Sequence, residues 1–235
     1  MYQEKNILTL TVIVPFYNEE ETLENSLIRL KKSQIADEVL LIDDCSTDNS
    51  LKIAKSFITN QGWKLYRNES NLGKGSAIQK ALDYISSDLF IVHDADLEYD
   101  PLDIIELKKY HDTHQNIIVL GSRFLDNEIR VNKYLRTKIA NKFLSLLFSI
   151  VNKVNCTDVA TCYKLFESKH LSKINLKEND FSIEVEILSK FLSMGLNLKE
   201  HPISYEGRTY EEGKKIGLLD GFKYIYTIFK YRFRN

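Results

Sequence analysis

The chain has 235 residues, 43% of them hydrophobic, and a formal net charge of −1. This length allows one sizeable core, and the near-neutral charge gives no electrostatic argument for nucleic-acid binding. Three cysteines without a Cys-x-x-Cys pair favour free thiols in a reducing compartment over disulfides or a zinc site. We find no apolar signal segment before the first strand and no run of the roughly 20 apolar residues that span a membrane, so we expect a cytoplasmic protein.

Strands and helices alternate through the first half of the chain. Apolar runs predict strands at residues 8–15, 38–42, 64–67, 89–92 and 117–120. Apolar side chains at helical spacing predict helices between them, the first with Leu23, Leu27 and Leu30 on one face. This alternation indicates an α/β fold whose mostly parallel central sheet is covered by helices on both faces.

The second half predicts longer helices. Residues 129–157 contain six basic residues and no acid, and residues 134–154 have a helical pattern. The segment 130–155 fits either a core helix with a solvated flank or an amphipathic segment on an anionic membrane, and we favour the membrane interpretation. The apolar face that would insert consists of Phe143, Leu144, Leu146, Leu147, Phe148, Ile150 and Val151. Residues 181–194 predict an amphipathic helix and 196–205 a strand. We expect one catalytic domain over 1–212, followed by a basic, aromatic helix over 213–235 that suits a core position or an interfacial anchor.

Three acids follow the fourth strand, Asp94, Asp96 and Glu98. If the extended backbone continues, they project to one side, where their mutual repulsion favours a bound cation. Such oxygen ligands suit Mg²⁺ or Mn²⁺ held together with substrate phosphates. The carboxyl end of a parallel strand is also the usual ligand site of an open α/β sheet. The alternative is an ordinary loop with solvated acids.

Four loops fall at the carboxyl ends of predicted strands and would converge on one edge of the sheet. They are Pro15-Phe16-Tyr17-Asn18-Glu19, Asp43-Asp44, Asp94-Ala95-Asp96 and Gly121-Ser122-Arg123, and Asn71-Leu72-Gly73-Lys74-Gly75 lies between the second and the third. In kind and order these motifs resemble the family-2 glycosyltransferases with the GT-A nucleotide-sugar-binding fold. Within that family the chain is most similar to the polyprenyl-phosphate sugar synthases of the dolichol-phosphate mannose synthase type.

The resemblance implies a role for each motif residue. For donor binding it implies Pro15, Tyr17 and Glu19 around the base and ribose, Asp44 on the base or ribose, and Asp94 on the ribose. It implies that Asp96 and Glu98 hold the metal, and that Arg123 meets phosphate. Lys74 precedes a predicted helix N-terminus, a place that attracts phosphate, although an ordinary surface lysine fits equally well.

The acceptor side rests on later residues. Glu184 and Glu186 lie where the family has acids facing the acceptor, so they are either candidate bases or ordinary polar-face residues. Arg208, Lys214 and Lys215 form a basic loop that could clamp the acceptor phosphate or the leaving diphosphate, or could be a charged loop balanced by its own acids. We take Asp96, Arg123, Arg208 and Lys214 as the predicted catalytic residues, with Lys215 on the substrate.

The resemblance implies a metal-dependent, inverting transfer of a sugar from a GDP- or UDP-linked donor to a polyprenyl (dolichyl or undecaprenyl) phosphate. The enzyme would be peripheral on the cytoplasmic face of an anionic membrane, with its carboxy-terminal end meeting the membrane or a small membrane-protein partner. A lipid phosphate is already anionic and needs no strong base, whereas a sugar hydroxyl does. Two alternatives stay open: a family-2 transferase extending a cell-surface glycan, and a non-catalytic membrane-docking module of the same fold.

Overall fold

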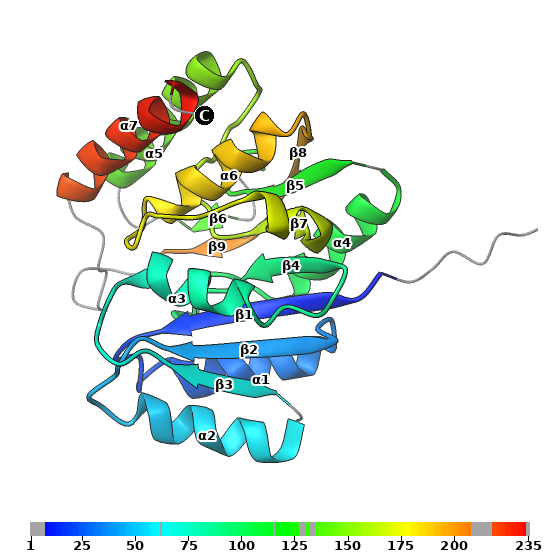
Figure 1. The fold of residues 1–235 in the computed structure, drawn as a ribbon, viewed down its shortest axis with the longest axis vertical. Helices are drawn as coiled ribbons and strands as arrows, with labels where there is room; N and C mark the ends of the chain where they lie inside the picture. The colour runs from blue at the N-terminus through cyan, green and yellow to red at the C-terminus, as the bar shows by residue number, and fades with distance from the viewer. Residues whose placement is uncertain are drawn as a thin grey trace, which may run out of the picture.

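The computed structural model describes residues 8–61, 63–114, 116–126, 130–131, 135–207 and 218–233. A seven-stranded sheet of order β3-β2-β1-β4-β7-β5-β8 lies between two layers of helices (Figure 1). Its strands are β1 (Leu10–Phe16), β2 (Glu38–Asp43), β3 (Lys64–Arg67), β4 (Leu89–Val92), β5 (Ile117–Ser122), β7 (Lys164–Glu167) and β8 (Asn197–Pro202). A separate pair joins β6 (Arg130–Val131) to β9 (Tyr205–Glu206). The predicted fold class is confirmed.

The antiparallel strand β7 lies between β4 and β5, and the other strands of the large sheet run parallel. The sequence pattern predicts no strand at β7. The reason is its composition, because only Leu165 and Phe166 are apolar and charged residues stand at both ends. All four residues of β7 are nevertheless buried, since strands flank it on both sides.

Helices cover both faces of the sheet. One layer consists of α1 (Leu23–Ser33), α2 (Ser50–Gln61) and α4 (Leu102–Asp112), and the other of α3 (Lys74–Leu82), α5 (Leu135–Asn152), α6 (Ile183–Ser193) and α7 (Leu218–Phe233). Alternate residues of β1 serve the two layers, because successive side chains of a strand point to opposite faces. Val12 and Val14 pack in the core under α1, and Ile13 packs in the core under α3.

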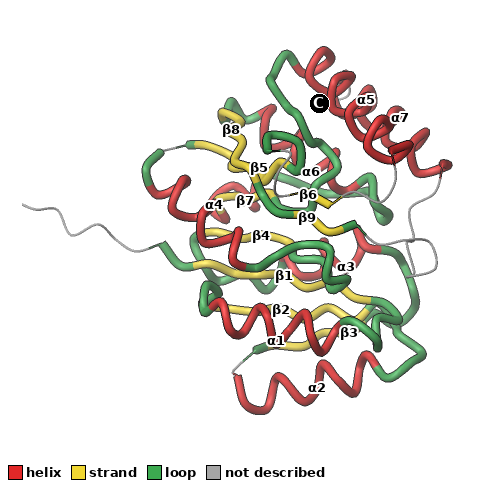
Figure 2. The backbone as a smooth tube through the Cα atoms, turned by 180° about the vertical axis from the view of Figure 1, so that it is seen from behind, coloured by secondary structure: helices red, strands yellow, loops and turns green. Residues whose placement is uncertain are grey.

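Helices α5 and α7 lie side by side, as the two opposite views show (Figures 1 and 2). In the described part of the segment 130–155, the exposed face is not the whole apolar face that we predicted to insert into a membrane. Phe148 is fully buried, Leu144 is nearly so, and Leu147 and Val151 pack against the core, so the expectation that these four residues face a membrane is wrong. They face inward because α5 packs on the same core as α6 and α7. Among the helices in the described ranges, none has the length and apolarity to span a bilayer.

Candidate active site

The loops that follow β1 and β2 are joined by hydrogen bonds in both directions. The Asn18 N–H donates to Ser46 Oγ at 3.1 Å, and Asn18 Oδ1 accepts from the Thr47 N–H at 2.8 Å. The Glu19 N–H donates to Ser50 Oγ at 2.8 Å. These bonds fix two of the predicted donor loops relative to each other without any ligand.

Pro15 and Tyr17 stand at the end of β1. The carbonyl of Ile13 accepts the N–H of His93 just beyond the end of β4, so the backbone of Pro15, two residues further on, faces the same side beyond that strand. A proline is tolerated there because no ladder hydrogen bond is lost. The half-buried Tyr17 follows at the edge of the sheet, in the place expected for a donor-binding side chain.

Asp44 is almost fully buried. Its Oδ1 accepts from Asn68 Nδ2 at 2.7 Å and from the Leu72 N–H at 3.1 Å, and its Oδ2 accepts from the Gly73 N–H at 2.7 Å. The carboxylate therefore ties the end of β2 to the segment that leads into α3. Its contact with the base or ribose stays a prediction.

The N-terminus of α3 has an intramolecular partner. The N–H groups of Gly75 and Ser76 donate to the Asn179 carbonyl, at 2.8 and 3.3 Å. A Cβ on Gly73 would lie 2.4 Å from that carbonyl oxygen, and one on Gly75 would lie 2.1 Å from the Glu178 oxygen. The two glycines are therefore needed where the 178–180 loop crosses α3. The interpretation that this N-terminus is open to phosphate does not fit, because a carbonyl caps it.

Lys74 belongs to a chain of charges that runs from Asp94 through Lys74 and Glu184 to Lys164, half-buried at Asp94 and Lys74 and buried at Glu184 and Lys164. Lys74 Nζ lies 2.7 Å from Asp94 Oδ1 and 2.9 Å from Glu184 Oε1, and Lys164 Nζ lies 2.7 Å from Glu184 Oε2. Burial disfavours charge on Lys74, but the two facing carboxylates more than offset it and raise its pKa. Burial likewise opposes charge on Glu184, and the two lysines reverse that effect and lower its pKa. Lys74 and Glu184 are therefore charged and paired with each other at neutral pH.

The segment after β4 turns instead of continuing the strand. Residues 93–100 form no regular strand, and Leu97 has a left-handed φ of 64°. The expectation that Asp94, Asp96 and Glu98 alternate on one side of an extended backbone is therefore wrong. Asp94 turns to Lys74, Asp96 Oδ1 accepts the Glu98 N–H at 3.2 Å, and Glu98 Oε2 accepts the Tyr205 hydroxyl at 2.7 Å. All three acids are half-buried at this edge.

Arg123 forms a bidentate pair with Asp158. Its Nε and one terminal nitrogen each lie 2.7 Å from a carboxylate oxygen, and its guanidinium carbon lies 4.8 Å from the centre of the Tyr205 ring. Burial disfavours the charge, but the carboxylate outweighs it and raises the Arg123 pKa further. Because the side chain is only 5% exposed, this pair anchors the end of β5 to the loop before β7. Contact between Arg123 and a phosphate stays a prediction. It requires the guanidinium to bind the phosphate beside Asp158 or to leave that carboxylate.

Glu186 has a structural partner set. Its carboxylate accepts the backbone N–H groups of Lys177 and Glu178, at 2.7 to 2.9 Å, and pairs with Lys190 Nζ at 2.7 Å. It is fully buried, so it holds the loop before α6 in place. The basic-loop residues Arg208, Lys214 and Lys215 lie outside the described residues.

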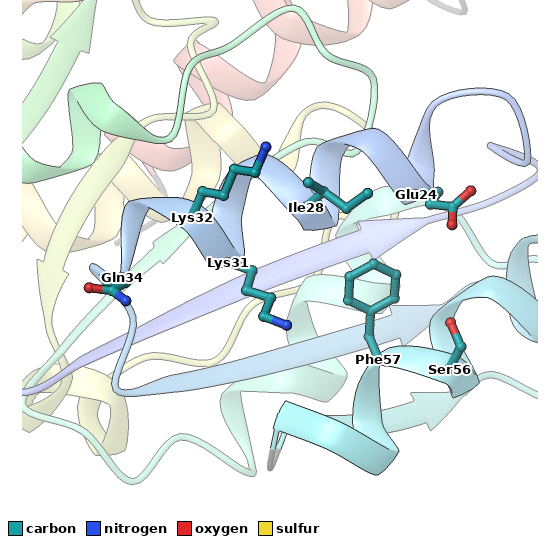
Figure 3. Close-up of a pocket in the computed structure, with 7 residues that line it drawn as sticks. All are labelled: Glu24, Ile28, Lys31, Lys32, Gln34, Ser56 and Phe57. Carbon is teal, nitrogen blue, oxygen red and sulfur yellow. The ribbon is translucent and has the colours of Figure 1, made fainter.

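A separate groove of about 640 Å³ lies between α1 and α2, where Glu24, Lys31 and Phe57 are among the lining residues (Figure 3). None of the predicted site residues lines it. The predicted donor and metal residues lie instead at the carboxyl ends of β1, β2, β4 and β5 and in the loops that follow them. The sequence did not predict the roles of the Asn179 carbonyl, Asp158 and Lys164 as partners of residues in this region.

The chain matches a known protein family over most of its sheet. The model of glycosyl transferase family 2 matches residues 11–174, which is more than half of the chain. The chain therefore belongs to that family and is a glycosyltransferase.

Among its relatives, the UDP-N-acetylglucosamine–dolichyl-phosphate N-acetylglucosaminyltransferase of Methanococcus voltae is 26% identical over 92% of this chain and 93% of that protein. The dolichol-phosphate mannosyltransferase of Pyrococcus furiosus is 25% identical over 95% of this chain and 64% of that protein. The chain is thus similar to the polyprenyl-phosphate sugar synthase group. Glucosyl-3-phosphoglycerate synthase from Mycobacterium tuberculosis, solved with Mn²⁺ and UDP, shares the fold, with a TM-score of 0.71 at 20% identity over 95% of this chain and 80% of that one.

Proposed function

We propose that this glycosyltransferase moves a sugar from a nucleotide diphosphate sugar to a polyprenyl phosphate at the cytoplasmic surface of a membrane. The relatives named above act on dolichyl phosphate by name, which supports this acceptor class. The observation that carries the proposal is a pair of exposed apolar stripes on α5 and α7.

The apolar stripes have the same spacing on both helices. They consist of Ile139, Phe143, Leu146 and Ile150 on α5, and Phe222, Tyr226, Phe229 and Phe233 on α7, with exposed fractions from 41% to 75%. Each set follows an i, i+4, i+7, i+11 pattern, so each forms one line along its helix. Two such lines on adjacent helices suit the boundary between headgroups and acyl chains. The exposed cations Lys142 and Arg232 on these helices add attraction to anionic lipids, about 1 kcal/mol each.

The hydrogen bonds and ion pairs of Glu184 and Glu186 favour a phosphate nucleophile over a sugar hydroxyl. A hydroxyl acceptor needs a base within reach of its proton. Glu184 lies between two lysines, and Glu186 is buried under a backbone loop, so neither carboxylate is poised to take a proton. A phosphate monoester is already anionic near neutral pH and needs only to be positioned.

A divalent metal fits Asp96 and Glu98. Both are half-buried carboxylates directly after β4, and hard oxygen ligands suit Mg²⁺ or Mn²⁺. Within the described residues, no three histidine, cysteine or acidic side chains converge as a metal site. A pair of carboxylates completed by the donor diphosphate matches the way Mg²⁺ binds in nucleotide enzymes. When bound, the metal would neutralise charge developing on the leaving diphosphate.

In the proposed reaction, a phosphate oxygen of the lipid attacks the anomeric carbon as the bond from that carbon to the diphosphate oxygen breaks. The products are the lipid phosphate sugar with inverted configuration and the nucleoside diphosphate. Pro15, Tyr17, Glu19, Asp44 and Asp94 are the proposed donor residues. Arg208, Lys214 and Lys215 are proposed to hold the acceptor phosphate and the leaving group. Arg123 would join them if it dissociates from Asp158.

The test is transfer from UDP-N-acetylglucosamine, UDP-glucose and GDP-mannose to polyprenyl phosphate in anionic vesicles containing Mg²⁺ or Mn²⁺. Soluble saccharides serve as the competing acceptors. We expect labelled lipid from one donor. Transfer to a saccharide with no labelled lipid would instead favour a glycan-extending transferase, and nucleotide-sugar binding without any transfer would favour a docking module.

A further inference from the structure

Helix α7 has a second side, opposite in character to its apolar stripe. Three of its polar side chains reach the 178–180 loop, which precedes α6. Lys230 Nζ lies 2.5 Å from Glu178 Oε1, and the Tyr231 hydroxyl donates to the same oxygen at 2.8 Å. Lys223 Nζ lies 2.7 Å from Asp180 Oδ2. The loop is thus fastened to α7 at both of its ends.

The same loop presses on α3 from its other side. The Asn179 carbonyl accepts two N–H groups at the start of that helix, and Gln79 Nε2 donates to the Glu178 carbonyl at 3.0 Å. The close approach to Gly73 and Gly75 leaves no room for even a methyl group between loop and helix. A shift of the loop therefore has to move the start of α3 or break these hydrogen bonds.

The start of α3 in turn holds two proposed donor residues. The Gly73 N–H donates to Asp44, and Lys74 pairs with Asp94. An unbroken series of contacts therefore runs from α7 through the 178–180 loop and residues 73–75 to Asp44 and Asp94.

We infer that the 178–180 loop is a clamp through which α7 positions the donor-binding residues. Glu178 and Asp180 are positioning residues in this account, since they act through Asn179 and α3. Because α7 also carries one of the apolar stripes, seating of that helix on a membrane would be felt at the donor site. Both steps rest on the proposed function: the clamp on its donor residues, and the link to the membrane on its lipid acceptor.

The test uses the full-length double variant Lys223→Gln/Lys230→Gln, which breaks both ion pairs from the α7 side. The control is Lys109→Gln, which removes a more exposed ion pair with Glu106 on α4, away from the 178–180 loop. The first readout is amide hydrogen exchange of the peptide covering residues 71–78. The second is the dissociation constant for UDP-N-acetylglucosamine and GDP-mannose, measured by calorimetry.

We expect exchange in residues 71–78 to become several times faster in the double variant and donor binding to weaken about three- to tenfold, in the range of measured coupling between sites. In turnover assays KM for the donor should rise while kcat changes little. Lysine-to-arginine replacements should restore both readouts, because a guanidinium also pairs with a carboxylate. Glu178→Gln, which breaks one pair from the loop side, should show a smaller change in the same direction.

Unchanged exchange in residues 71–78 in the double variant, with an unchanged melting temperature, would overturn the clamp. Equal acceleration in the Lys109→Gln control would overturn it too, because the effect would then be general loosening. If exchange responds but no lipid is ever glycosylated, the clamp stands and the proposed acceptor fails. Anionic vesicles should slow exchange at residues 71–78 in the wild type only, and equal slowing in the double variant would remove the link to the membrane.

Discussion

The charged edge of the sheet and the helix pair α5–α7 differ in how their energetically unfavourable side chains are accommodated. The edge has charges withdrawn from solvent, and the helix pair has apolar side chains exposed to it. At the edge, charges withdrawn from solvent are paired with each other in the part of the chain that the structure describes, as Lys74 is with Asp94 and Glu184, and Arg123 with Asp158. On the helix pair, large apolar side chains stand in solvent, Phe222 at 71% and Phe233 at 75%. A buried charge must be paired inside the protein, whereas an exposed apolar line can take its partner from outside. The edge is thus preorganised, whereas the exposed stripes of the helix pair are the part for which we propose a partner outside the protein.

The largest expected effect is at the edge. Asp96→Asn removes one ligand charge from the proposed metal site, so we expect transfer to fall by at least roughly a hundredfold. Circular dichroism should show an unchanged fold, because Asp96 is only half-buried. EDTA should inhibit the wild type reversibly, with recovery on adding Mn²⁺ or Mg²⁺. Full activity in EDTA would remove the metal from the account.

A second substitution tests whether the charge chain depends on its central carboxylate. Glu184→Gln leaves Lys74 and Lys164 without the charge they share, and breaking a buried pair costs about 3–5 kcal/mol. Urea denaturation should therefore show a large loss of stability. Glu21, an exposed acid before α1, gives the control Glu21→Gln, which should change stability by less than about 0.5 kcal/mol. Equal stabilities of the two variants would mean that the chain is not a stabilising feature.

A matched pair on one helix separates the two sides of α5. Phe148→Ser opens a cavity in the core and should cost about 3–5 kcal/mol. Phe143→Ser changes a side chain that is 55% exposed and should leave the melting temperature nearly unchanged, while co-sedimentation with anionic vesicles weakens. If Phe143→Ser destabilised the protein as strongly as Phe148→Ser, the exposed stripe would be part of the core.

A smaller effect comes from His93, which is buried between Ser26 Oγ and the Tyr163 hydroxyl, at 3.0 and 2.8 Å from its ring nitrogens. Burial lowers the His93 pKa to about 4, and the nearby Asp94 charge only partly opposes this. Between the ordinary value of 6.5 and about 4, the unfolded chain binds a proton that the folded protein does not. The free energy of unfolding should therefore decrease as the pH is lowered from 6.5 to about 4, by up to about 3 kcal/mol from this group.

The variant His93→Gln isolates that contribution. Urea midpoints of the wild type and the variant should converge as the pH falls through the window, because glutamine does not titrate. A constant difference between the two proteins would show that His93 has the same pKa in the folded and unfolded states.

The sequence predicted the parallel strands and the edge where their loops meet, because apolar runs and strand-end motifs are local signals. It could not predict that Asp158 would pair with Arg123, since the two lie 35 residues apart. They meet because β7, which follows Asp158, pairs with β5, which precedes Arg123. The sequence also could not predict which face of α5 is exposed. Apolar residues surround much of that helix, from Phe143 to Ile150, so periodicity alone does not say which line packs inward. That choice depends on α7 and the sheet.

The role of Gly73 and Gly75 illustrates the same limit. A glycine-lysine-glycine run before a helix predicts a phosphate site from local chemistry. The structure uses the glycines for the crossing of a loop about a hundred residues further along the chain. No local pattern in the sequence distinguishes these two uses.

The central claim is that the apolar stripes bring the enzyme to a lipid-borne phosphate. The most direct measurement compares the wild type with Phe143→Ser/Phe222→Ser on two acceptors, long-chain polyprenyl phosphate in anionic vesicles and a short, water-soluble prenyl phosphate. We predict that the variant loses at least roughly tenfold on the vesicle acceptor, since each buried phenylalanine contributes about 1.5–3 kcal/mol. It should retain wild-type rates on the soluble acceptor. Equal rates of wild type and variant on the vesicle acceptor would contradict the claim.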